Sequence, residues 1–157
     1  MYSTILTPTD GSVRSRGVVA AALEVAQRFD ARLHLFRSVA IPPEFPAAAH
    51  VLPDHLPEFL ESEARRSLEE LAAGNARIRI EPPDMMTAQP WRAILEAAAR
   101  LGAELIVIGS HGYGGWDRIL GTTASKVVDH SDRNVLVVHE RRGVAGVMPV
   151  PSSAPRA

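Results

Sequence analysis

Residues 105–123, LIVIGSHGYGGWDRILGTT, are the most informative part of the chain. An apolar strand ending at Ile108 leads into a glycine-rich loop, and a helix is predicted to begin at Thr122. Glycine lets backbone N–H groups approach an anion closely, and the first turn of a helix offers further unpaired N–H donors. The stretch therefore predicts a phosphate-binding loop, and the alternative is a glycine loop without a ligand. The glycines of this loop are Gly109, Gly112, Gly114, Gly115 and Gly121.

Apolar runs alternate with helical patterns along the rest of the chain. Strands are predicted at residues 2–7, 32–39, 77–80, 104–108 and 135–138. Helices are predicted from an N-cap at Ser12 to Phe29, from the end of a proline-rich loop (41–57) to Ala73, from Trp91 to Leu101, and over 122–130. Such alternation indicates βαβ units, hence an α/β fold with a parallel sheet.

The inward faces of the first and last helices follow from the spacing of apolar residues. The first helix is expected to bury Val18, Ala22, Val25, Ala26 and Phe29. The last helix is expected to bury Ala124, Val127 and Val128.

Composition limits the function classes. The chain has 157 residues, a formal net charge of -1 and no cysteine. One domain is expected, without disulfides or thiol chemistry. Neither a basic excess, nor a long apolar run, nor a signal-peptide pattern is present, so we expect no nucleic-acid partner, no membrane association and a cytoplasmic location.

Two turns are expected to share one crevice. In open parallel sheets, ligands bind outside the carboxyl ends of the strands, where the strand order reverses. The turn from Pro8 to Ser12 follows the first strand, and the glycine loop follows the fourth. Asp10 in the first turn is interpreted as an acceptor for adenine or ribose, as the centre of an Asx turn, or as a helix-capping residue beside Ser12.

The remaining polar residues carry weaker signals. His111, Arg118 and Lys126 are candidate phosphate contacts, although solvated loop and surface roles compete. Trp116 is interpreted as a residue that covers a base or mediates a protein contact, or as a partly buried anchor that orders the loop. No histidine spacing is typical of a metal site, and the loop lacks the Gly-Lys-Ser/Thr ending of a P-loop. No machinery for fast phosphoryl transfer is therefore visible.

Two segments resemble the universal stress protein family. ILTPTDGS (5–12) is similar to the family's first strand and turn, and GSHGYGGWDRILGTTASKVVDHSDRNVLVV (109–138) is similar to its glycine motif, short helix and last strand. The resemblance covers about residues 1–140. Residues 141–157 are predicted to be a disordered tail. The resemblance implies an adenine nucleotide α-hydrolase-like fold, with a five-stranded parallel sheet of order 3-2-1-4-5 and helices on both faces.

The resemblance also implies a ligand and a homodimer. The ATP-binding branch keeps the glycines that this chain has, which implies binding of ATP or a related adenine nucleotide, with Mg²⁺ as a candidate companion. The loop segment between Gly112 and Gly121 is one residue shorter than in that branch, and Gly114 and Gly115 are expected to absorb the difference. The implied contacts are Pro8, Asp10, Val39 (or Ser38), Ile108, Gly109, His111, Gly112, Gly121, Thr122 and Thr123.

The dimer is expected to form through the last strand, Asn134 to His139, because its apolar run would otherwise be an exposed edge. The leading function is an adenine-nucleotide-binding stress or signalling module without efficient catalysis. The alternatives are a dimeric scaffold that binds no nucleotide and a slow ATPase.

Overall fold

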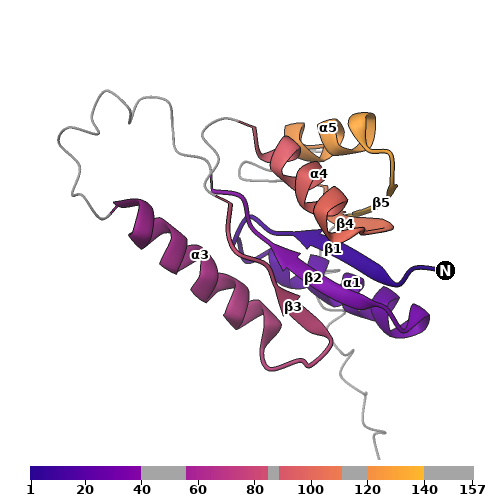
Figure 1. Cartoon of the computed structure of the whole chain (residues 1–157), viewed down its shortest axis with the longest axis horizontal. Coiled ribbons are helices and arrows are strands. Elements are labelled where there is room, and N and C mark those ends of the chain that lie inside the picture. The colour runs from indigo at the N-terminus through magenta and orange to yellow at the C-terminus, as the bar shows by residue number, and fades with distance from the viewer. Residues whose placement is uncertain (40–55, 85–88, 111–119, 140–157) are drawn as a thin grey trace, which may run out of the picture.

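The centre of the protein is a parallel sheet of five strands (Figure 1). A computed structural model describes residues 1–39, 56–84, 89–110 and 120–139. The strands are β1 (Thr4–Pro8), β2 (Arg32–Phe36), β3 (Ile78–Ile80), β4 (Leu105–Gly109) and β5 (Asn134–Val138). Their order is β3-β2-β1-β4-β5, and every pairing is parallel. The predicted order 3-2-1-4-5 is therefore confirmed.

Helices cover both faces of this sheet, as expected (Figure 1). The helices are α1 (Ser15–Phe29), α3 (Leu56–Ala72), α4 (Pro90–Leu101) and α5 (Thr122–His130). Helices α1 and α3 pack in one core cluster with β-strand residues such as Ile5 and Leu33. Helices α4 and α5 pack in a second cluster with Leu6 and Ile106. Because strand side chains alternate between faces, the central strands supply both clusters.

The ends of α4 follow from local chemistry that the sequence shows. Pro90 occupies the first turn, where its missing N–H and fixed φ are tolerated. Gly102 ends the helix in the left-handed region, with φ of 61°, which glycine adopts without a Cβ penalty.

Several predicted boundaries are wrong. Helix α1 begins at Ser15, and Arg14 is its N-cap, without a side-chain cap, so Ser12 does not cap it. Helix α3 begins at Leu56, inside the predicted proline-rich loop. Strand β2 ends at Phe36, although an isolated bridge between Ser38 and Asp84 continues its direction. Proline and turn signals locate such boundaries only to within a few residues.

Two predicted inward residues face water instead. Val128 in α5 is 42% exposed and Phe29 in α1 is 37% exposed, whereas Ala124, Val127, Val18, Ala22 and Ala26 are buried as expected. Phe29 packs edge-on against Tyr2, with ring centroids 5.1 Å apart, at the amino end of β1. Most of the proline-rich loop and the predicted tail, 141–157, lie outside the described residues. Within the described helices, none is long and apolar enough to cross a bilayer.

Candidate functional site

The turns after β1 and β4 lie at the same edge of the sheet, as the sequence predicted. Strand β1 pairs with β2 on one side and with β4 on the other, all in parallel. The carboxyl ends of these three strands therefore meet at the point where the strand order reverses. This is the position at which open α/β sheets bind ligands.

Asp10 organises the turn after β1. Its Oδ1 accepts hydrogen bonds from the Ser12 backbone N–H and from the Ser15 hydroxyl, both at 2.9 Å. The Asx-turn interpretation is thus confirmed. Burial raises the pKa of Asp10, but the hydrogen bonds from Ser12 and Ser15 outweigh it, so the net pKa lies below the ordinary value of 3.8. The group is a carboxylate at neutral pH, and its Oδ2 takes part in neither of these two bonds.

Gly11 and Arg37 form a close contact beside Asp10. Gly11 has φ of +75°, a conformation that suits glycine. A Cβ at this position would lie 2.5 Å from Nη1 of Arg37, so the guanidinium packs directly against the bare glycine backbone. This contact brings a half-buried cation from the end of β2 to the turn after β1.

Four buried hydroxyls at these strand ends lack hydrogen-bond partners among the described residues. They are Oγ1 of Thr7 and of Thr9, a residue only 8% exposed, and Oγ of Ser12 and of Ser38. Thr9 already uses its backbone N–H to donate to the Phe36 carbonyl at 2.8 Å. Buried polar atoms are almost always paired, so such hydroxyls call for a partner. A polar ligand in the crevice would satisfy them.

The backbone at both ends of the glycine loop is held in place. Gly121 donates its N–H to the Ser110 carbonyl at 2.7 Å, and Ser110 donates to the Val138 carbonyl at 2.9 Å. These hydrogen bonds therefore hold the start of α5 against the end of β4. Gly121 is the N-cap and supplies no side-chain cap, so the first-turn N–H groups, including those of Thr122 and Thr123, have no capping acceptor from it.

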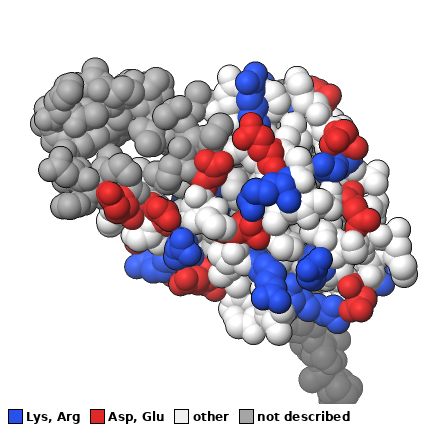
Figure 2. Space-filling view, viewed as in Figure 1, with Lys and Arg blue, Asp and Glu red and all other residues white. Residues whose placement is uncertain are grey.

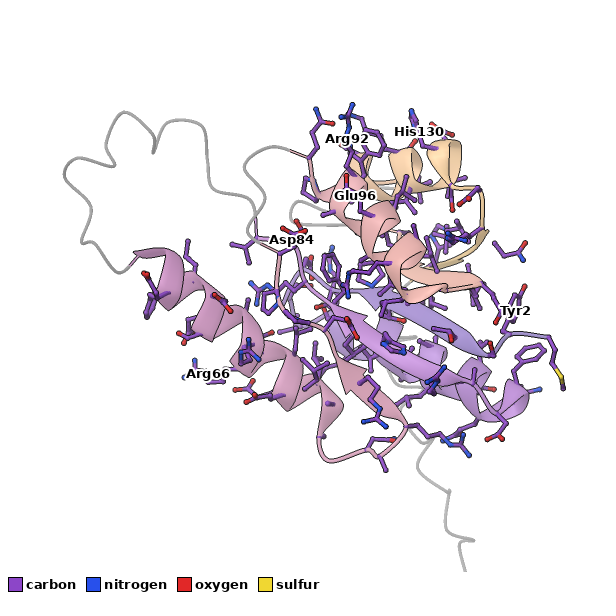
Figure 3. The ribbon with its side chains drawn as sticks, in the orientation of Figure 1. Tyr2, Arg66, Asp84, Arg92, Glu96 and His130 are labelled. Carbon is purple, nitrogen blue, oxygen red and sulfur yellow. The ribbon has the colours of Figure 1, made fainter. Side chains whose placement is uncertain are left out.

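The structure brings most of the predicted contacts to this edge. Pro8 ends β1, Gly109 ends β4, and Val39 follows β2, where its N–H donates to the Asp84 carbonyl at 2.8 Å. Figure 3 shows Asp84 beside the carboxyl end of β2. Ile108 is only 6% exposed and belongs to the core cluster under α4 and α5.

The remaining residues predicted for the site either lie away from the crevice or fall outside the described residues. His111, Gly112, Trp116 and Arg118 fall outside the described residues. Lys126 is exposed, and its Nζ lies over the ring of Trp91 on α4, 5.8 Å from the ring centroid.

Sequence reasoning missed two contributors to the site. Arg37 was overlooked because a single cation at the end of a strand has no motif, and only the Gly11 contact identifies it. Thr9 was overlooked because threonine is common in strands. In the described ranges, no group of three or more His, Cys, Asp or Glu side chains could hold a metal ion.

Comparison with known proteins agrees with this architecture. The sequence pattern of the Universal stress protein family matches residues 1–139. Universal stress protein A homolog 1 of Coxiella burnetii is 32% identical over 142 residues, covering 87% of this chain and 96% of that protein.

Solved structures show the same fold. A member of the universal stress protein family from Burkholderia pseudomallei has a TM-score of 0.66 and 27% identity, covering 87% of this chain and 96% of that one. A universal stress protein in complex with cAMP has a TM-score of 0.58 and 27% identity, covering 88% and 97%. Because the family pattern spans nearly all the described residues, the chain belongs to the universal stress protein family.

Proposed function

We propose that this chain binds an adenine nucleotide at the carboxyl ends of β1, β2 and β4 and acts as a stress-response or signalling module. The observation that carries the proposal is the set of buried, unpartnered hydroxyls at this edge, those of Thr9 and Ser38 among them, next to the ionised Asp10. Hydroxyls and a carboxylate suit the amino group and ribose of a nucleoside.

The phosphates belong at the other side of the crevice. The start of α5 is held beside Ser110 by the hydrogen bond from Gly121. It presents backbone N–H groups without a side-chain cap. Such a helix start favours a phosphate group. A related protein of the same family was crystallised with cAMP, which supports the adenine part of the proposal.

ATP is the nucleotide that we propose, with Mg²⁺ bound chiefly by its phosphate oxygens and water. Magnesium commonly uses few protein ligands together with substrate phosphates. The sequence has no P-loop lysine, so efficient phosphoryl transfer is not part of the proposal. The proposed location is the cytoplasm.

The second part of the proposal is a homodimer through β5. This strand is at one edge of the sheet, and its Leu136 side chain is 39% exposed. A matching strand from a second copy would cover Leu136 and pair the free backbone edge in one self-complementary contact.

The nucleotide proposal is tested by whether the protein retains a bound nucleotide through desalting. The protein is incubated with ATP and Mg²⁺, desalted and denatured, and the supernatant is analysed by mass spectrometry. The wild type should release an adenine nucleotide. Gly112→Val should release none, because a branched side chain would occupy the predicted phosphate position. Gly17→Val is the matched control, since Gly17 has open space around it in α1. Release of no nucleotide from the wild type would contradict the proposal.

A further inference from the structure

One face of the sheet carries an unusual group of arginines. In β2 and β3, Leu33, Leu35, Ile78 and Ile80 point toward α1 and α3. The alternate positions therefore face the α4 side. We call Arg32, Arg79 and Arg100 of α4, together with Arg77 from the turn before β3, the arginine face; the guanidinium of Arg77 pairs with Asp30, the C-cap of α1. In Figure 2, Lys and Arg side chains gather over β3 and the turn that precedes it.

Two acidic groups near the arginine face are paired with arginines, and a third, Glu104, accepts hydrogen bonds from Ser3. Glu81 is buried, at 8% exposure, between Nδ1 of His34 at 2.8 Å and Nη1 of Arg100 at 3.2 Å. Asp30 accepts from Arg77 at 2.8 Å. Arg32 and Arg79 are exposed and have no carboxylate partner in the part of the chain that the structure describes. Four arginines and these three carboxylates leave a small excess of positive charge, although the whole chain has a formal charge of -1.

The fold itself does not explain this arrangement. Pairing of Leu33 with Ile78 sets Arg32 opposite Arg77 by extension of the register, and Arg79 lies opposite His34. Like charges on directly opposite residues destabilise a sheet. Charges on an edge strand prevent unwanted pairing, which accounts for Arg79 in β3. It does not account for Arg32, because β2 is paired on both sides.

We infer that the arginine face is a docking surface for an acidic segment of a partner protein. Arginine suits this role because its planar guanidinium binds carboxylates in a bidentate manner. Single-stranded nucleic acid fits less well, since it is usually bound by stacking on aromatic rings. Residues 32–36 and 77–81 contribute no exposed aromatic ring.

The position of the face fits a signalling role. Arg32 is the first residue of β2 and Arg77 directly precedes β3, so the face extends toward the amino ends of these strands. The crevice described above lies at the carboxyl ends. An acidic segment and a ligand in the crevice would thus occupy different ends of the sheet and could be bound together. The inference does not depend on the nucleotide proposal.

The test is fluorescence anisotropy with a labelled poly-glutamate peptide and the full chain. The wild type should bind it, and added salt should weaken binding because exposed charges are screened. Arg32→Glu/Arg79→Glu should weaken binding by about tenfold or more. The control is Arg65→Glu/Arg66→Glu, which makes the same charge change on α3; Arg66 lies on that helix, away from β3 (Figure 3). This control should bind nearly as well as the wild type.

Three results would overturn the inference. They are the absence of peptide binding to the wild type, an equal loss in the control, and tighter binding of an oligothymidine than of the peptide. Circular dichroism checks that each variant is folded. Where the double Glu variant is unfolded, Arg32→Gln/Arg79→Gln replaces it, and unchanged peptide affinity in that variant also contradicts the inference.

Discussion

At the scale of single residues, Gly11 shows why one backbone angle matters to the crevice. Its φ of +75° allows the turn that presents Asp10, and its missing Cβ leaves room for the Arg37 guanidinium. The guanidinium is the far end of a flexible side chain and can move, so the backbone angle dominates the cost of a substitution.

Gly11→Ala should lower the free energy of unfolding by about 1–2 kcal/mol because alanine is strained at positive φ. Gly17→Ala is the control in α1, where added helix propensity should raise stability by about 0.5–1 kcal/mol. Urea denaturation measures both. Equal effects of the two substitutions would show that the Gly11 turn has been described wrongly.

Asp10 gives the site a dependence on pH. Its pKa is lowered in the folded protein, so the carboxylate stabilises the fold above the unfolded pKa. That contribution is lost as the pH falls through the folded pKa. Asp10→Asn should be less stable than the wild type at neutral pH, and the difference should shrink below about pH 4. Thermal melts of the two proteins between neutral and acid pH measure this difference in stability. A difference that grows toward acid pH would contradict the lowered pKa of Asp10.

At the scale of elements, α5 shows what sequence patterns can and cannot fix. Its bounds, Thr122–His130, were predicted correctly, because Gly121 and the spacing of apolar residues indicate the same helix. Its buried face was predicted only in part, since two adjacent valines in a short helix fit the same periodicity. Packing against α4 and the sheet decides that Val127 is buried and Val128 is not.

Val127→Ala should therefore lower the free energy of unfolding by on the order of 2 kcal/mol, from lost burial and a cavity. Val128→Ala should change it by less than about 0.5 kcal/mol. Chemical denaturation of the two variants compares them directly. A larger loss at Val128 would mean that the helix is rotated from the described position.

The candidate site shows a different limit of sequence reasoning. Glycines and Asp10 were identified because turns and phosphate loops have recognisable chemistry. The Arg37 contact and the unpartnered Thr9 hydroxyl were not, and Ser38 was named only as an alternative to Val39, because these features depend on the register between β1 and β2. Register brings together residues that are distant in sequence, and no local pattern reports it.

At the scale of the whole molecule, the proposed dimer assigns the two sheet edges different roles. Strand β3 is short and carries an exposed Arg79, whereas β5 has Leu136 39% exposed. Leu136→Lys should convert a dimer to a monomer, because it places a charge in the proposed interface. Val128→Lys, on the exposed face of α5, should not. Light scattering at tens of micromolar distinguishes them, and a monomeric wild type would rule out the dimer.

Isothermal titration calorimetry of the wild-type chain with ATP tests whether the crevice binds an adenine nucleotide. We expect saturable binding of ATP with one site per chain, weakened in Asp10→Ala because the turn after β1 loses its organising carboxylate. GTP serves as the comparison and should bind more weakly. Absence of heat from ATP, ADP and AMP alike at about millimolar concentration would contradict the account.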